Sequence, residues 1–307
     1  MRKDQFESPD YYMVEKLFSE EQIIVRDATR QWVKEYVSPI IEDYNLKGVF
    51  PKELIKGIAE IGGFGAILPA KYGGSELDLI SYGLMMQELE RGDSSIRVMC
   101  SIQTSLVMNN IYEHGNDFHK EEFLLKLSKG ELIGSFGLSE PGHGSDPASM
   151  QTRHTIDGDH YIINGSKMWI GNAPFCDIAL VWSKSANDNY ACFIVRRNDP
   201  GFSTSKIDKK WSFRASETGE LIFDNCKVHK KYLLFESDSI NAALRSLNIA
   251  RYAVACGSIG IAMECYDVAL KYSNERTQFG KKISSNQLIQ KKLVDMITEI
   301  TKAQLLN

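Results

Sequence analysis

The sequence predicts an α+β protein in which a helical segment, a β-rich segment and a second helical segment follow one another. Three observations predict this order. Up to residue 133, apolar residues recur at helical spacing between glycine and proline breaks. From residue 134 to about 235, short runs rich in β-branched and aromatic residues alternate with turn dipeptides. From residue 236 the helical spacing returns, so we expect three domains: 1–133, 134–235 and 236–307.

The first segment reads as helices throughout. Ser19-Glu20-Glu21-Gln22 has the pattern of a capping box, and a break is expected at Ser38-Pro39. Between them, four side chains recur every fourth residue on one helical face: Ile24, Ala28, Trp32 and Tyr36. Further helices are expected at residues 52–61, 79–91, 101–112 and 118–127.

The middle segment reads as strands. The expected strands lie within residues 161–163, 168–170, 178–182, 191–195 and 220–228. Turn signals separate several of them: Asp157-Gly158, Asn164-Gly165 and Pro200-Gly201. No helix long enough for a βαβ unit lies between these runs, which favours an antiparallel β-barrel or sandwich over a Rossmann sheet.

The last segment reads as the start of a helical bundle. Small residues would let two helices approach closely, and these are Ala253, Ala255, Gly257, Gly260 and Ala262. A break is expected at Phe279-Gly280. The final helix carries an apolar stripe from Leu288 to Ile300 and ends at Asn307 without a capping glycine. We expect one or more further helices to follow and to cover this stripe.

Charge and composition exclude several classes of function. A net charge of -4 gives no long-range attraction for nucleic acid or for anionic membranes. The first residues, Met1 to Glu7, contain no apolar leader core, and no uncharged apolar run is long enough to insert into a membrane. We therefore expect a cytoplasmic protein. The six cysteines and six histidines show no ligand spacing, so we expect free thiols and no metal site.

A glycine-rich stretch stands at the border between the helical and β-rich segments. Residues 136–146 read Phe-Gly-Leu-Ser-Glu-Pro-Gly-His-Gly-Ser-Asp, and a loop with so many small residues and free backbone N–H groups can hold an anionic or polar ligand. The dinucleotide-binding fingerprint fails here because Pro147 stands where a third glycine is needed. An ordinary glycine turn is the alternative.

Two more clusters can take part in binding. Trp169 lies on an expected strand next to Gly171, where a flat ring could stack; the alternative is a core tryptophan. Arg276 lies beside Phe279 at a helix end, where a guanidinium suits a pyrophosphate; the alternative is a solvated helix terminus.

The three clusters in this order, on this helix, barrel and helix plan, resemble the acyl-CoA dehydrogenase family from about Ser19 onwards. The resemblance implies FAD as cofactor, an acyl-CoA substrate, and a homo-oligomer, a tetramer, as the working form. It implies FAD contacts from Phe136, Leu138, Ser139, Gly144, Ser145, Trp169, Ile170, Gly171 and Phe279, with Arg276 and Gln287 reaching the FAD of a neighbouring subunit. It also implies acyl-CoA contacts from Ser145, Leu247, Asn248 and Arg251. Without the resemblance, residues 244–251 are a helix packed by Leu247 and exposed through Arg251.

Within that family, glutaryl-CoA dehydrogenase is the more specific resemblance. It is carried by residues 88–97, 101–108, 214–216 and 286–300. It implies that Arg97, helped by Ser101, faces the far carboxylate of the substrate. A guanidinium can bind a carboxylate through two parallel hydrogen bonds, whereas burying that carboxylate unpaired is costly. The alternative is that Arg97 pairs with Asp93 or Glu90 on the surface.

The reaction implied is removal of a proton next to the thioester and transfer of a hydride to flavin N5, followed by decarboxylation to crotonyl-CoA. Reoxidation would use an electron-transferring flavoprotein. The family's base is a glutamate in a Tyr-Glu-Gly-Thr type of motif, which this sequence lacks, so we assign no catalytic base. Glu140, Asp146 and Glu217 are carboxylates without an assigned role.

Two alternatives follow from the positions where this sequence differs from the family pattern. Gly171 replaces the family's usual hydroxyl residue, which also suits a short-chain acyl-CoA dehydrogenase or oxidase of the same fold. A catalytically incomplete flavin-binding fragment is the other.

Overall fold

The computed structural model describes residues 4–7 and 9–307. Met1, Arg2 and Lys3, which entered the argument about a leader, lie outside the described residues. The α-helices are α1 (Glu20–Trp32), α2 (Ile41–Lys47), α3 (Leu54–Glu60), α4 (Leu79–Gly92), α5 (Ser94–Ser101), α6 (Asn109–His114), α7 (Asp117–His119), α8 (Leu125–Ser128), α9 (Asn241–Glu275) and α10 (Gln287–Leu306). The strands are β1 (Gly134–Gly137), β2 (Arg153–Asp157), β3 (His160–Gly171), β4 (Ile178–Lys184), β5 (Tyr190–Arg196), β6 (Phe202–Lys206), β7 (Thr218–His229), β8 (Leu233–Ser237), β9 (Thr277–Gln278) and β10 (Lys281–Lys282).

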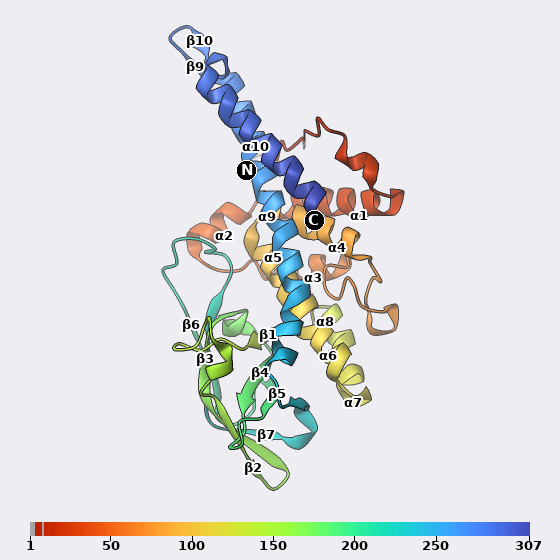
Figure 1. Ribbon diagram of the computed structural model, residues 1–307, viewed down its shortest axis with the longest axis vertical. Coiled ribbons are helices and arrows are strands. Elements are labelled where there is room, and N and C mark those ends of the chain that lie inside the picture. The colour runs from red at the N-terminus through yellow and green to blue at the C-terminus, as the bar shows by residue number, and fades with distance from the viewer. Residues whose placement is uncertain (1–3, 8) are drawn as a thin grey trace. The chain divides into compact units, whose positions relative to one another are not determined.

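The described elements confirm the predicted order of helical, β-rich and helical segments (Figure 1). The chain folds as two compact units. Unit 1 contains residues 1–42, 78–97 and 252–307, and unit 2 contains residues 43–77 and 98–251. The boundaries of the three predicted domains stay a prediction, because the two compact units group the residues differently from those domains.

In unit 1, α1 begins where the sequence predicts. The Ser19 hydroxyl accepts the Gln22 N–H and the Gln22 side chain accepts the Ser19 N–H, so the capping box is confirmed. The predicted stripe, however, is buried only at Trp32, because Ile24 and Tyr36 are exposed. The buried side chains of this stretch are Thr29, Trp32, Val33 and Val37.

Helix α9 packs closely against α4 within unit 1. A Cβ atom on Gly260 would lie 1.9 Å from the Gln87 carbonyl oxygen, and one on Gly257 would lie 2.8 Å from Glu90 Oε2. Only glycine leaves room for these contacts, so the predicted close approach through small residues is confirmed at these two positions.

Helix α10 lies alongside the second half of α9 and meets it at the hairpin β9–β10 (Figure 1). Ile300 is buried with Phe6, Ile259, Met263 and Tyr266, and the neighbours that pack around them include Leu293, Met296 and Ile297 of α10. The expectation that the α10 stripe has no partners in this chain is therefore wrong for that part, because α9 and Phe6 cover it.

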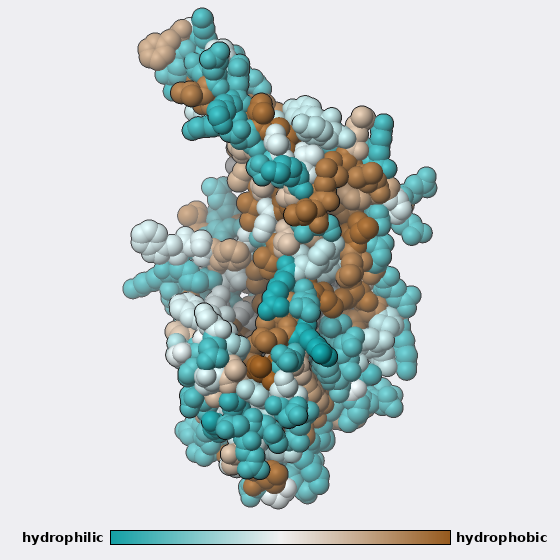
Figure 2. All heavy atoms as spheres, in the orientation of Figure 1, coloured by the Kyte–Doolittle hydropathy of each residue, from teal (hydrophilic) through white to brown (hydrophobic). Residues whose placement is uncertain are grey.

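Other apolar side chains of unit 1 stay on the surface. The most exposed near the end of α10 are Leu17, Ile80, Leu305 and Leu306. Figure 2 shows hydrophobic surface gathered where the end of α10 approaches α4. An apolar groove of about 210 Å³ lies there, between the N-terminal segment, α4, α9 and α10.

Unit 2 is built on one eight-stranded sheet with the order β6-β7-β3-β2-β4-β5-β8, and β1 pairs with β4. The pairing is antiparallel except that β1 and the start of β2 run parallel to β4. The outer strands β6 and β8 do not pair with each other in the described chain, so the expected barrel is not closed.

One predicted turn proves to be a bulge. Asn164-Gly165 was expected to separate two strands, but β3 runs unbroken from His160 to Gly171. The ladder to β7 shifts register between Ile163 and Gly165, where Gly165 has φ 140°. An Asn-Gly pair supplies the same conformational freedom to a bulge as to a hairpin turn, which is why the sequence signal was misleading.

Candidate functional site

An open cleft of unit 2 lies beside the end of β3 and has a volume of about 530 Å³, within the range of small-molecule sites. Helical residues on one side and strand and loop residues on the other form its walls. Its lining consists of Val98, Ile102, Trp169, Gly171, Lys210, Trp211, Ser212, Phe213, Ser216 and Thr218. Among the described residues, no carboxylate belongs to this lining, so the cleft can bind a flat apolar group but carries no carboxylate base; Lys210 is its titratable side chain.

Trp169 is held out from the sheet by the backbone. It has φ 64°, a left-handed conformation that is costly for a bulky residue. The β3–β7 ladder breaks between Lys167 and Ile170, so Trp169 sits in a bulge and its side chain is 61% exposed. The core alternative for this tryptophan is therefore wrong. A strained, exposed indole at a cleft is arranged for stacking.

Gly171 follows in β3, and its missing side chain has a structural consequence. A Cβ atom at this position would lie 2.4 Å from Cδ1 of Ile102 and 3.9 Å from Val98 Cγ1. Ile102 therefore occupies the space that a threonine or serine would need. This wall of the cleft is apolar and offers no hydroxyl donor.

The far wall of the cleft is a loop, residues 207–217, whose aromatic residues the sequence did not identify as part of a site, although residues 214–216 contributed to the resemblance. Trp211 is fully exposed and Phe213 has φ 52°. Arg214 holds the loop to the end of α2, because Nε and Nη2 donate to the carbonyls of Asn45 and Leu46 at 2.8 and 3.0 Å. For Trp211 and Phe213 themselves, the sequence signal is the Trp-x-Phe pattern alone.

The glycine-rich loop carries five of the predicted FAD contacts, and the structure divides them. Phe136 and Leu138 are buried, so they can offer a ligand only backbone atoms. The Ser139 carbonyl accepts the Met168 N–H at 2.9 Å, next to Trp169. Gly144 and Ser145 are exposed at the loop tip. None of the five belongs to the lining of the cleft in the described chain.

Glu140 and Lys167 form a buried ion pair at the base of this loop, 2.9 Å apart. Burial raises the pKa of Glu140, but the Lys167 charge and hydrogen bonds from Gln151 and Thr152 outweigh it and lower that pKa to about 2. Burial lowers the pKa of Lys167 to about 8, although Glu140 opposes this. Both side chains are therefore charged at neutral pH.

The other two unassigned carboxylates are also engaged. Asp146 Oδ2 accepts the Ser149 hydroxyl at 2.5 Å, and Glu217 Oε1 accepts the Phe50 N–H at 3.3 Å. Neither they nor Glu140 is poised as a general base towards the cleft.

Arg97 is buried in unit 1, with an exposed fraction of 5%, and its Nε donates to Oε2 of the equally buried Glu90. The alternative of a surface pairing is therefore half right: the partner is Glu90, but the pair is not on the surface. Gly257 of α9 makes the space, since a Cβ there would lie 3.1 Å from Arg97 Nε. Arg97 immediately precedes Val98, which lines the cleft of unit 2.

Ser101, four residues further along α5, is also buried, and its hydroxyl donates to the Val98 carbonyl at 3.1 Å. On α9, Arg251 Nη1 donates to Asn248 Oδ1 at 3.1 Å, both side chains are exposed, and Leu247 is half-buried.

The remaining predicted FAD residues lie in unit 1. Arg276 precedes the hairpin β9–β10, and Phe279 lies in its turn, which has φ 49° at Phe279 and 74° at Gly280. Gln287 begins α10. All three side chains are exposed in this single chain. Ile170, by contrast, is buried in unit 2 and pairs with Gly219.

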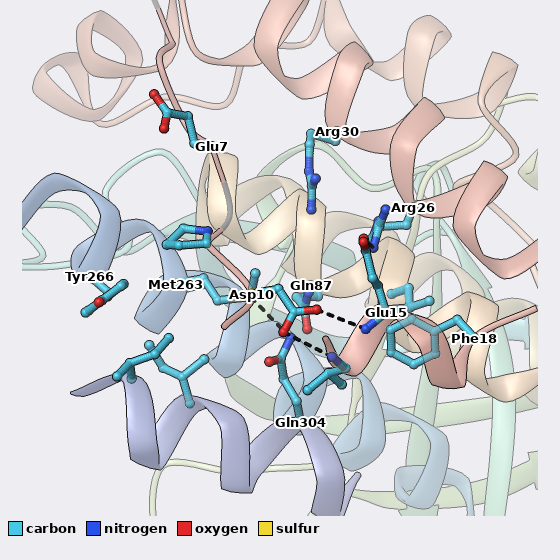
Figure 3. A pocket seen from close by; sticks show the side chains of 15 residues that line it. Glu7, Asp10, Glu15, Phe18, Arg26, Arg30, Gln87, Met263, Tyr266 and Gln304 are labelled. Atoms are coloured by element: carbon cyan, nitrogen blue, oxygen red, sulfur yellow. Dashed lines mark hydrogen bonds and ion pairs between the residues drawn. The ribbon is translucent and has the colours of Figure 1, made fainter. Parts of the chain in front are cut away.

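Unit 1 contains a separate cavity of about 320 Å³ between the N-terminal segment, α1, α4, α9 and α10. Figure 3 shows Arg26 and Arg30 on one side of it and Gln304 on the opposite side. Arg26 pairs with Glu15 at 3.4 Å and Arg30 with Glu88 at 2.7 Å. Because these charges are already paired with each other, the cavity is a weaker candidate for chemistry than the cleft of unit 2.

Neither a metal site nor a disulfide is present in the part of the chain that the structure describes. Helix α9 is long and apolar enough to cross a membrane by length and composition, although 44% of its most apolar 18-residue window is buried. A core helix has the same properties, and the glycines of α9 pack against α4. The cytoplasmic location stays a prediction.

Comparisons with known proteins match all three segments. Residues 19–131, 135–226 and 240–307 match the families described as acyl-CoA dehydrogenase N-terminal, middle and C-terminal domains. A glutaryl-CoA dehydrogenase from Desulfococcus multivorans is 35% identical over 297 residues, 94% of this chain and 76% of the relative. A short/branched chain specific acyl-CoA dehydrogenase from Rattus norvegicus is 34% identical over 294 residues, 94% of this chain and 68% of the relative.

Among solved structures, a glutaryl-CoA dehydrogenase from Mycobacterium smegmatis in complex with FADH2 superposes with a TM-score of 0.95 at 36% identity. The match covers 98% of this chain and 78% of that one. Relatives that act on different acyl groups are similar at nearly equal identity, so the overall match does not choose between substrates.

We expect Gly171→Ala to destabilise the protein by about 1–3 kcal/mol, because its Cβ collides with Cδ1 of Ile102. Ile102→Val removes that Cδ1 atom. The double variant should therefore recover at least about 1 kcal/mol relative to the sum of the single variants, measured by chemical denaturation. Additive losses would show that Ile102 does not occupy the space.

We expect Glu140 to make unfolding pH-dependent. Its pKa in the folded protein lies below the ordinary value of 4.5, so its stabilisation is present above pH 4.5 and is lost as the pH falls towards about 2. Over that window the wild type should lose about 3 kcal/mol more than Glu140→Gln in its free energy of unfolding. Parallel pH profiles for the two proteins would contradict the assignment.

Proposed function

The chain belongs to the acyl-CoA dehydrogenase family, and from this premise we propose that it uses FAD to oxidise glutaryl-CoA, with decarboxylation to crotonyl-CoA. The bound flavin supplies the two-electron acceptor for the hydride that leaves the substrate. The features of unit 2 fit a flat redox ring: an open cleft of about 530 Å³, an exposed Trp169 and a Gly171 without a side chain.

The single observation that carries the choice of substrate is the buried guanidinium of Arg97. A buried arginine needs a counter-charge, and Glu90 supplies one through the Nε edge. A planar guanidinium is the side chain that binds a carboxylate through two parallel hydrogen bonds. Arg97 precedes cleft residue Val98, which supports its role in binding the far carboxylate of a diacid thioester, with Ser101 as a second polar group.

The other proposed roles follow from the family. Phe136, Leu138 and Ile170 would meet FAD through backbone atoms because they are buried, whereas Trp169 would offer its ring. Acyl-CoA would be bound by Ser145, Leu247, Asn248 and Arg251. We assign no base, because the described carboxylates near the site are engaged elsewhere.

A homo-oligomer, a tetramer, is part of the proposal. Arg276 and Gln287 are exposed in the single chain, as residues that reach the FAD of another subunit would be. Helix α9 also presents apolar side chains at spacings of seven and four residues on its exposed face: Val254, Ile261, Val268 and Tyr272.

An electron-transferring flavoprotein is the proposed acceptor. One observation favours a second candidate, an oxidase that reduces oxygen: Ile102 and Gly171 leave the cleft wall without a hydroxyl donor. Comparing the rates at which oxygen and an electron-transferring flavoprotein reoxidise the reduced protein separates the two.

The test of substrate choice is the variant Arg97→Gln/Glu90→Gln, which removes both charges and so leaves none buried and unpaired. We expect the Kd of glutaryl-CoA for the FAD-loaded protein to rise at least about 100-fold, since the diacid loses its partner, whereas the Kd of butyryl-CoA changes less than about fivefold. Both constants are measured from the flavin absorption spectrum.

The matched control is Arg196→Gln/Asp199→Asn, which removes another ion pair, of 2.6 Å, in the sheet of unit 2. It should leave the ratio of the two Kd values unchanged. Equal losses for both thioesters in the Arg97 variant would defeat glutaryl-CoA as substrate. Flavin colour that glutaryl-CoA does not bleach would defeat oxidation itself.

A further inference from the structure

The start and the end of the glycine-rich loop both contact the ammonium group of Lys167 in unit 2. Its Nζ donates to the Leu138 carbonyl at 3.1 Å and to Glu140 Oε1 at 2.9 Å, both at the start of the glycine-rich loop. It also contacts Met150 Sδ at 3.8 Å, at the end of the loop. Lys167 itself belongs to β3 and its side chain is fully buried. One cation therefore joins both ends of the loop to the strand.

The carboxylate of Glu140, at the start of the loop, also binds the end of the loop. It accepts the backbone N–H of Gln151 at 2.7 Å and that of Thr152 at 2.9 Å, together with the Thr152 hydroxyl at 2.5 Å. All of its oxygens are thus engaged by the end of the loop and by Lys167. Gly165 lets Thr152 come this close, since a Cβ at 165 would lie 2.6 Å from Thr152 Oγ1.

The tip of the loop has no comparable support. Ideal Cβ atoms on Gly142 and Gly144 would meet nothing within 4 Å, and residues 144–146 are exposed. The order of the tip must therefore come from its base, where the pair Glu140–Lys167 closes the loop.

The same pair stands next to the bulge that carries Trp169. Lys167 is the last residue of β3 in register with β7 before the shift, and the Met168 N–H is taken by Ser139 of the loop. Fixing Lys167 against Leu138 and Glu140 therefore fixes where the bulge begins. That position determines the left-handed backbone of Trp169, φ 64°.

A buried ion pair is a poor way to gain stability, because desolvation of two charges offsets much of their attraction. What the pair does is fix positions. Each charge keeps its partners only if the start of the loop, the end of the loop and strand β3 stay in one arrangement relative to one another. We infer that Glu140 and Lys167 are positioning residues that hold the glycine-rich loop and Trp169 in the one arrangement that grips the flavin, an inference that rests on the proposed function.

The test uses apo-protein and FAD-loaded protein of Lys167→Met, Glu140→Gln and the double variant. Amide hydrogen exchange should be at least 10-fold faster at Gln151 and Thr152 in each single variant, because both amides donate to Glu140. The Kd of FAD, measured by quenching of its fluorescence, should rise at least 10-fold. The double variant should lose no more than the worse single variant, because the two residues act as one unit.

Asp199→Asn is the control for general destabilisation, because Asp199 is also buried and accepts three bonds from Arg196. It should lower the Tm but keep loop exchange and the Kd of FAD within twofold of the wild type. The inference would be overturned if Lys167→Met and Glu140→Gln behaved like this control. It would also be overturned if the losses of FAD affinity in the two single variants multiplied in the double variant.

A wild type that binds no FAD would defeat the proposed function and the flavin part of this inference together. The exchange rates at Gln151 and Thr152 in the same protein would still decide whether the pair orders the loop.

Discussion

The arrangement of unit 2 depends on one electrostatic constraint: a lysine with no exposed surface has to be neutralised inside a sheet of apolar side chains. Lys167 can remain charged there only if it forms an ion pair with Glu140 and a hydrogen bond to the Leu138 carbonyl. Because Glu140 in turn needs the backbone of Gln151 and Thr152, the chain must close the glycine-rich loop over the strand. The exposed, left-handed Trp169 and the cleft beside it follow from that closure.

The sequence predicted most elements because their signals are local. The Ser19 capping box depends on residues three positions apart. Gly257 and Gly260 indicate close helix packing, whichever helix is the partner. The errors arose where one local signal serves two structures. Asn164-Gly165 is as suitable for a bulge as for a turn, and the α10 stripe gives no hint that Phe6, far away in the sequence, covers part of it.

The residues of the candidate site also fall into those that a local sequence signal predicts and those that depend on the fold. Trp169 and Gly171 are neighbours in the sequence, so they could be singled out, but the clash of Gly171 with Ile102 depends on residues 69 positions apart that only the fold brings together. The alternatives for Arg97 could not be resolved from spacing either. Both pairing partners are in helical reach, and only burial distinguishes a solvated surface pair from the desolvated Glu90–Arg97 pair, where any change of charge is costly.

The most direct measurement of the central claim, that a flat redox ring is gripped beside Trp169, is a calorimetric titration of apo-protein with FAD. We predict about one FAD per chain for the wild type, at least 10-fold weaker binding for Trp169→Ala, and unchanged binding for Trp182→Phe, since Trp182 is buried in the sheet. A wild type that binds no FAD, or a Trp169→Ala protein that binds it equally well, would contradict the account.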